Sequence, residues 1–173
     1  KTIKVKNINL RSKKIIISTG GYPKKLEIEG GKYCISSDEA LNFETLPKEL
    51  VVIGGGYISL ELANVFALLG TKVHLIHRGK SLLRGFDTDL VELITDTLLK
   101  LGVSINTETE VYKINQEKRN FRVVLSNKAI LYAEYVLCAI GREPSTKNLN
   151  LQNIGIKVEK DKSISVDKNL ETS

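Results

Sequence analysis

The sequence predicts an α/β fold, built on a parallel sheet with helices between its strands and a separate antiparallel meander. Three observations predict this class. Short runs of branched aliphatic residues stop at glycines, a long apolar helical segment joins two of these runs, and a later segment alternates with a period of two. With 173 residues, of which 42% are hydrophobic and 27% charged, the chain can bury a sizeable core as one domain.

The N-terminal part of the chain is expected to hold two buried strands and a short helix. Residues 13–19 read KKIIIST and stop at a turn of two glycines, a tyrosine and a proline, which is typical of a strand end. A short helix is expected over residues 37–43, with Ser37 or Asp38 as its N-terminal cap. Residues 50–53, LVVI, are the second strand, and they run directly into three glycines.

The next elements complete a β-α-β unit. Residues 57–69 are apolar on nearly every face, with Glu61 as their only charge, and predict a helix packed between two layers. Gly70 ends this helix. Residues 72–77, KVHLIH, form the following strand, so a right-handed crossover between parallel strands is expected.

The second half of the chain continues the sheet and adds the meander. Asp87 begins an amphipathic helix that Gly102 closes. Its apolar positions are Leu90, Leu93, Ile94, Leu98 and Leu101. Residues 103–105 are a short strand, residues 107–131 have the period of an antiparallel three-stranded meander, and residues 134–140 are a further buried strand. The remaining C-terminal residues predict loop and short strands.

The glycines after the second strand predict a nucleotide site. The pattern Gly54-x-Gly56-x-x-Ser59 follows a strand and begins a helix, the context in which such a loop binds a dinucleotide. Gly54 permits the tight turn, and Gly56 lets the backbone approach a pyrophosphate at the helix N-terminus, where free N–H groups favour negative charge. Ser59 replaces the third glycine and is small enough for close packing. The fold is therefore expected to be Rossmann-like, with a purely structural turn as the alternative.

The residues after the following strand favour NADP over NAD. An Asp or Glu there would accept the ribose 2′-hydroxyl of NAD, whereas arginine would bind the 2′-phosphate of NADP. Residues 62–86 contain no acidic residue but include Arg78 and Arg84. Planar guanidinium groups suit a phosphate dianion. The sequence thus predicts NADPH as the cofactor, with two ordinary surface arginines as the alternative.

Composition disfavours several other classes of protein. No apolar run approaches the roughly 20 residues that a membrane span needs, and the N-terminal residues do not resemble a signal peptide. We therefore expect no membrane association and a cytoplasmic location. The net charge of +6 arises in residues 1–32, where nine Lys and Arg face two Glu. Because no interleaved aromatic residues or known nucleic-acid motif accompany these charges, no nucleic-acid partner is expected.

The cysteines and the absence of methionine lead to further expectations. Cys34 and Cys138 are too few and too far apart in the sequence for a disulfide framework or a local redox pair, which favours a reducing compartment. Cys138 lies on a buried strand and is expected to be inert packing. The chain contains no Met, which indicates a processed or excised segment.

Three segments resemble a known family over essentially the whole chain. The runs VVIGGGYISLELANVFALLG, HRGKSLLRGFD and CAIGREPSTKNL are similar to the NADPH domain of the FAD-containing pyridine nucleotide-disulfide oxidoreductases, and most similar to its glutathione reductase branch. The resemblance implies that residues 1–35 end an FAD-domain part and linker, residues 36–145 form the NADPH domain, and residues 146–173 return toward the FAD domain.

The resemblance also implies roles for individual residues. The backbone of Gly54, Gly55, Gly56 and Ile58 would contact the pyrophosphate and its ribose. Tyr57 would cover the nicotinamide pocket, Glu61 would lie near the nicotinamide, and Gly141 and Arg142 would close the nucleotide site. An ordinary half-buried aromatic, a carboxylate at the rim and a structural arginine are the alternatives for Tyr57, Glu61 and Arg142.

For the parent protein, the resemblance implies an NADPH-dependent oxidoreductase. Hydride would pass from NADPH to FAD and on to a redox-active disulfide, with glutathione disulfide as substrate and a homodimer as the assembly. The redox cysteine pair and the acid-base histidine of the family have no counterparts here, so the chain alone is expected to be inactive. The alternatives are the corresponding domain of a dihydrolipoamide dehydrogenase or a mercuric-reductase-like enzyme, and a stand-alone nucleotide-binding module.

Overall fold

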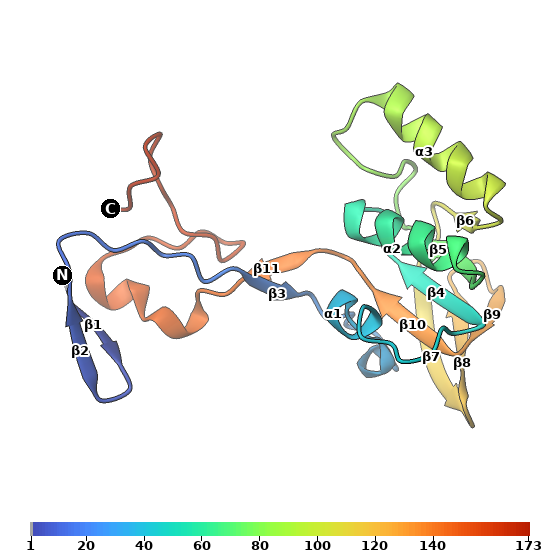
Figure 1. Ribbon diagram of the computed structural model, residues 1–173, viewed down its shortest axis with the longest axis horizontal. Helices are drawn as coiled ribbons and strands as arrows, with labels where there is room; N and C mark the ends of the chain where they lie inside the picture. The colour runs from blue at the N-terminus through green and yellow to red at the C-terminus, as the bar shows by residue number, and fades with distance from the viewer. Residues whose placement is uncertain (1) are drawn as a thin grey trace. The chain divides into compact units, whose positions relative to one another are not determined.

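The computed structural model describes residues 2–173, which divide into two compact units (Figure 1). The central unit is Pro23–Arg142, and the split unit comprises the residues up to Tyr22 together with Glu143–Ser173. The resemblance implies domain boundaries after residues 35 and 145, and the compact units of the structure divide after residues 22 and 142. Residues 23–35 join the central unit because their apolar side chains, among them Leu26 and Ile28, pack on its core.

A parallel sheet organises the central unit, in the strand order β10-β4-β5-β6. Its strands are β4 (Glu49–Ile53), β5 (Lys72–Ile76), β6 (Ser104–Asn106) and β10 (Tyr135–Cys138), and all pairings are parallel. Helix α2 (Tyr57–Leu68) connects β4 to β5, and α3 (Thr88–Lys100) connects β5 to β6. The predicted α/β class, the β-α-β unit and its flanking strands are therefore confirmed.

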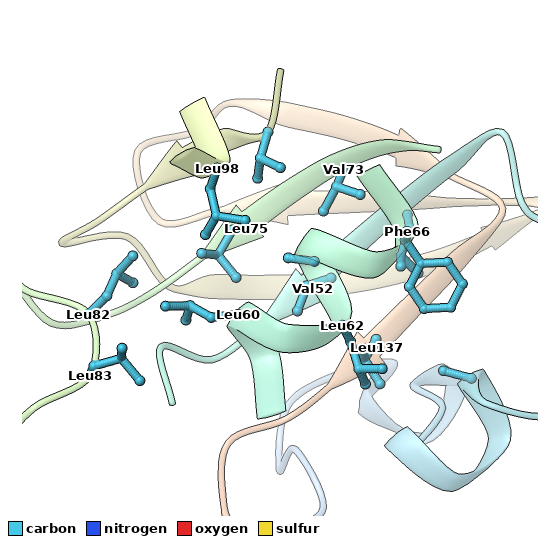
Figure 2. Packing of buried hydrophobic residues seen from close by; sticks show 14 residues of the cluster. Val52, Leu60, Leu62, Phe66, Val73, Leu75, Leu82, Leu83, Leu98 and Leu137 are labelled. Atoms are coloured by element: carbon cyan, nitrogen blue, oxygen red, sulfur yellow. The ribbon is translucent and has the colours of Figure 1, made fainter. Parts of the chain in front are cut away.

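The two faces of this sheet bury separate clusters of side chains because neighbouring residues of a strand point in opposite directions. Leu50 and Val52 of β4 pack against Leu60, Ala63 and Phe66 of α2, as Figure 2 shows for most of these residues. Val51 and Ile53 belong to the cluster on the other face. The strands are thus apolar on both faces, as their unbroken aliphatic runs predict.

The predicted meander covers the second face of the sheet. It consists of β7 (Val111–Glu117), β8 (Asn120–Leu125) and β9 (Ile130–Ala133), paired antiparallel in this order. Ile114, Val123 and Leu125 are buried in the same cluster as Val51 and Ile53. In β8 the buried positions alternate with more exposed ones, in agreement with the period of two in the sequence, whereas a register shift in β7 places its two buried residues three positions apart.

Helix α3 forms where it is predicted, with Asp87 as its N-cap, but much of its apolar surface is not buried. Leu98 is the buried residue of the helix, whereas Leu90 and Leu93 are 58% and 65% exposed. Val91 packs partly against the core one turn from Thr95, whose hydroxyl donates to the Val91 carbonyl. The side that contacts the core therefore runs through positions 91, 95 and 98, and the polar Thr95 hid it from the sequence pattern.

Helix α1 (Ser37–Ala40) is shorter than predicted, and its N-cap lies one residue before the first of the two expected caps. Ser36 is the N-cap: its hydroxyl accepts from the Glu39 N–H, and the Glu39 carboxylate accepts from the Ser36 N–H. This reciprocal arrangement satisfies two backbone donors at the helix start. It precedes the predicted Ser37 and Asp38 because the pattern Ser-x-x-Glu begins at Ser36.

The split unit differs most from the predictions. Residues 13–19 form no strand, and Ile16 is 90% exposed, because the neighbouring hairpin of β1 (Thr2–Val5) and β2 (Ile8–Arg11) pairs with itself. The hairpin was not expected. The C-terminal residues contain β11 (Arg142–Pro144), which pairs with β3 (Gly21–Pro23), and two 3₁₀ helices, η2 (Lys147–Leu149) and η3 (Leu151–Ile154). Beyond β11 the short strands expected there are reduced to two isolated bridges among the described residues.

None of the helices described is long and apolar enough to cross a membrane.

Candidate functional site

A cavity of about 760 Å³ opens in the central unit where three parallel strands end. Its lining includes Ile53, the last residue of β4, with the three glycines after it, Ile76, the last residue of β5, with the two residues after it, and residues 139–141, which follow β10. The chain leaves β4 toward β5 on one side, while β10 lies on the other, so the strand order reverses here. Such a switch point at the carboxyl ends of parallel strands is where open α/β sheets bind ligands.

Gly54 makes the turn from β4 into the cavity wall. Its φ of +134° lies outside the range that residues with a side chain commonly adopt. A Cβ atom at this position would lie 2.3 Å from the Ala139 carbonyl oxygen and 2.6 Å from Ser59 Oγ. Only glycine therefore fits between β4 and β10, for conformational and steric reasons together.

Ser59 occupies the position of the third glycine and is fully buried at the start of α2. Its hydroxyl donates to the Ala139 carbonyl at 3.2 Å. The small side chain thus permits the close packing of α2 on the sheet, and its single polar group is satisfied. The departure from the usual glycine adds a link between α2 and the segment that follows β10.

Gly56 presents a free surface to the cavity. A Cβ atom here would have no neighbour within 4 Å, and the residue is the N-cap of α2 without a side chain to cap the helix. The first amide groups of α2 have no partner within a helix and carry its positive end. Gly55, by contrast, is closed off, because a Cβ there would lie 2.5 Å from His77 Nδ1.

The two predicted arginines lie on the same cavity. Arg78 follows β5, and Arg84 follows Leu83, whose N–H donates to the Gly55 carbonyl at 2.7 Å. This hydrogen bond holds the loop after β5 against the glycine turn, and the buried side chains of Leu82 and Leu83 fasten it to the core (Figure 2). Both guanidinium groups are exposed. They can therefore meet an anionic ligand without first losing a buried partner.

Most of the other predicted site residues also line the cavity. Tyr57 and Ile58 do so from the first turn of α2, and Gly141 from the segment after β10. Glu61 does not: it lies on the exposed side of α2, one turn further along. Arg142 is exposed at the start of β11 and is also not part of the lining. The structure thus brings eight of the ten predicted residues together.

Sequence reasoning missed charged residues that reach the cavity from distant parts of the chain. Lys24 and Glu27 come from the segment that enters the central unit, and Glu110 precedes β7. The Lys24 N–H donates to the Gly141 carbonyl at 3.0 Å, which places the two segments side by side. No local motif marks these residues, because long-range pairing alone carries them to the site.

His77 is a further lining residue that the sequence did not identify. Its ring lies between two glycines, since a Cβ at Gly79 would approach His77 Nε2 to 2.6 Å, as one at Gly55 would approach Nδ1. Burial lowers the pKa of His77, a hydrogen bond with the Ser81 backbone raises it, and the charge of Arg78 lowers it further. The imidazole is therefore mainly neutral at pH 7, and the cationic charge of the site rests on Lys24, Arg78 and Arg84.

The two cysteines, expected to be unrelated, lie together. The thiol of Cys34 interacts with that of Cys138 at the end of β10, and Cys138 Sγ donates to the Lys24 carbonyl at 3.7 Å. Ile35 bridges Leu137 in parallel, which brings the segment from Cys34 beside β10. Their separation in the sequence hid this contact. Among the described residues no cluster of three or more His, Cys, Asp or Glu could hold a metal ion.

The whole chain, residues 1–173, matches the family model described as pyridine nucleotide-disulphide oxidoreductase. The chain belongs to this family. Membership agrees with the expectation drawn from the glycine loop and the segments around the two arginines, and with the Rossmann-like parallel sheet.

Named relatives are similar over almost all of the chain. It is 36% identical to a chloroplastic/mitochondrial glutathione reductase of Pisum sativum, over 94% of the chain and 30% of that protein. It is 34% identical to a mercuric reductase of Staphylococcus aureus, over 100% of the chain and 32% of that protein. A trypanothione reductase of Trypanosoma congolense is 37% identical, over 91% and 33%. The chain thus spans about a third of the length of these relatives.

A solved structure is similar to this chain in both sequence and fold. The HOCl-induced flavoprotein disulfide reductase RclA from Escherichia coli is 32% identical, with a TM-score of 0.88, over 96% of this chain and 39% of that one. The similarity supports an α/β fold of the flavoprotein disulfide reductase type for the described residues.

Proposed function

We propose that the central unit binds NADPH and forms the NADPH domain of a larger, FAD-containing disulfide reductase. The observation that carries this proposal is the convergence on one cavity of the glycine turn, the N-terminus of α2 and two arginines. A pyrophosphate would lie at Gly56, where the space is open, and the 2′-phosphate would lie between Arg78 and Arg84. The volume of about 760 Å³ is that of a typical cofactor cavity.

The cavity residues would divide the work of binding. Backbone N–H groups at the start of α2 would donate hydrogen bonds to the pyrophosphate. The two arginines would distinguish NADPH from NADH by binding the 2′-phosphate. Gly141 and Tyr57 line the cavity and would position the nicotinamide half. Bound NADPH would supply a hydride, which the parent protein would pass by way of FAD to a disulfide. We assign Glu61 and Arg142, which lie off the cavity, to the rim of the nucleotide site in the parent.

Titration calorimetry of the chain with NADPH and NADH tests the cofactor. We expect tighter binding of NADPH, and the change of both Arg78 and Arg84 to Ala to weaken it about 10- to 100-fold, since a hydrogen bond to a charged group contributes ~1.5–3 kcal/mol. NADH binding should change little. Arg119→Ala, in the exposed turn between β7 and β8, is the matched control. Equal affinity for both nucleotides would refute the NADP assignment.

The acceptor of the parent protein is proposed to be glutathione disulfide. The support is the similarity to glutathione reductases, but a mercuric reductase and a trypanothione reductase are similar to a comparable degree. NADPH oxidation by the parent, measured with glutathione disulfide, trypanothione disulfide and Hg(II) in parallel, separates them. Turnover with Hg(II) alone would overturn the disulfide assignment. The proposed homodimer follows from the same resemblance, and light scattering tests it. The proposed cytoplasmic location follows from the composition and the cysteine usage, and fractionation of cells tests it.

A further inference from the structure

The segment that carries Cys34 runs beside the end of β10. The Ile35 N–H donates to the Val136 carbonyl at 2.9 Å, and the Cys138 N–H donates to the Ile35 carbonyl at 2.9 Å. These two hydrogen bonds fix the register of a parallel pair. They also fix which side chains share a side, and both cysteines lie within the central unit.

Both cysteines point to the same side of this pair. Ile35 and Leu137 pack in the cluster that faces α2. Cys34 and Val136 pack in the cluster that faces the meander, and Cys138 lies two residues beyond Val136, on the same side of its strand. The two thiols interact with each other, and Cys138 Sγ donates to the Lys24 carbonyl at 3.7 Å. Cys138 is buried and Cys34 partly exposed, so a small molecule reaches the pair from the side of Cys34.

We propose that Cys34 and Cys138 are an oxidisable pair that a peroxide converts to an intramolecular disulfide. Neither cysteine lines the cavity, although the Cys138 thiol donates to the carbonyl of Lys24, which does. The proposed disulfide differs from the redox disulfide of the parent enzyme, which would lie outside this chain. Cys34 lies opposite Val136 and Cys138 two residues further along β10, so the S–S bond would join diagonal neighbours on one side of this pair.

The thiol contact also favours the first step of such a reaction. The hydrogen bond from Cys34 and the N–H of Ile140 lower the pKa of Cys138 to about 7, although burial opposes this. The hydrogen bond and burial raise the pKa of Cys34. Cys138 is therefore the thiol of the pair that ionises more readily to the thiolate, which is the nucleophilic form, and Cys34 remains the protonated partner.

The electrons and atoms balance with hydrogen peroxide as the oxidant. The Cys138 thiolate attacks one peroxide oxygen, the O–O bond breaks, and the released hydroxide takes up a proton to give water and a sulfenic acid. Cys34 sulfur then attacks the Cys138 sulfur. The S–S bond forms, the S–O bond breaks, and the leaving hydroxide takes the Cys34 proton as a second water. Two thiols are oxidised and one peroxide is reduced.

The test is treatment of the reduced chain with a small excess of hydrogen peroxide, followed by peptide mapping without reductant. We expect one linked pair of peptides that contains Cys34 and Cys138, with the loss of two hydrogens from the intact mass. The cross-link closes a long loop, so it should raise the melting temperature by about 5–15 °C, reversibly on addition of a thiol reductant.

Single changes to serine provide the controls. Cys34→Ser and Cys138→Ser should each fold in the reduced state, show no linked peptides and lose the rise in melting temperature. In Cys34→Ser, a sulfenic acid on Cys138 should become trappable by dimedone, because the resolving thiol is gone. Oxidation of the unmodified chain to separate sulfinic acids, or to disulfides between chains only, would overturn the proposal.

Discussion

Two aliphatic runs of nearly the same character have opposite fates in this molecule. Residues 50–53 form the buried core of β4, where Leu50 is 0% exposed, whereas residues 13–19 form no strand and Ile16 is 90% exposed. The difference lies in their neighbours. Strand β4 is paired on both edges, by β10 and β5, and covered on both faces. A β-branched run thus becomes a strand only where other segments satisfy its backbone and cover its side chains.

The largest difference in stability between the two runs is expected when a large side chain of each is shortened to alanine. Leu50→Ala should lower the free energy of unfolding by about 2–5 kcal/mol, since it removes buried methyl groups and leaves a cavity. Ile16→Ala should change it by no more than about 0.5 kcal/mol. Urea titrations of both variants measure this. Equal destabilisation would mean that residues 13–19 pack against a surface after all.

The glycines that follow the two runs give the next contrast. Gly54→Ala combines a left-handed φ with a close approach to the Ala139 carbonyl, so we expect a loss of about 2–4 kcal/mol. Gly20 also has a positive φ, +64°, but open space around it. Gly20→Ala should therefore cost about 1 kcal/mol. Thermal unfolding of the pair compares them, and a milder Gly54 variant would contradict the steric argument.

A smaller loss of stability is expected at helix α1, which local hydrogen bonds stabilise more than burial does. Ser36→Ala removes the hydroxyl of the cap of α1 and should lower the free energy of unfolding by about 1 kcal/mol. Ser37→Ala, one residue later, is the control and should be nearly neutral. Urea unfolding of both variants decides the point. If the two variants are equally stable, the Ser36 hydroxyl does not support the helix.

The smallest effect at neutral pH concerns the histidines, both of which lie in the central unit. Burial first, and then the charge of Lys72, lower the pKa of His74, while Glu49 raises it, and His74 Nδ1 is buried without a hydrogen-bond partner among the described residues. The unfolded chain therefore binds more protons below about pH 6.5, and stability falls as the pH drops through the window between this value and the lowered pKa.

The change His74→Leu tests this pH dependence. The variant should show a shallower fall of stability between about pH 7 and 5, measured by urea titration at each pH. Some fall should remain, because the pKa of His77 is lowered as well. An unchanged slope would show that His74 does not titrate differently in the two states.

Sequence periodicity predicted the elements that carry a local pattern of their own. The sheet strands, α2, α3 and the meander were found because each carries its own periodicity and stops at a glycine or polar break. The glycine turn and Arg78 and Arg84 were found because the Rossmann motif is local. Their common position on one cavity follows from the strand order.

Features that depend on long-range pairing could not be read from the sequence. The carboxylates of Glu27 and Glu110 reach the cavity from far outside the glycine motif. The contact of Cys34 with Cys138 depends on the bridge between Ile35 and Leu137. The face of α3 that contacts the core was obscured because it includes Thr95, a polar residue whose hydroxyl is satisfied within its own helix.

The hydrogen bond between the Lys24 N–H and the Gly141 carbonyl means that the central unit begins and ends at nearly the same point. A domain whose two ends lie close together can be inserted into a surface loop of another protein, because both of its ends then join the same loop. The same closeness permits a circular permutation, in which a short peptide joins residues 142 and 23. New termini would then fit the exposed turn between β7 and β8, leaving the cavity and its glycine turn uncut.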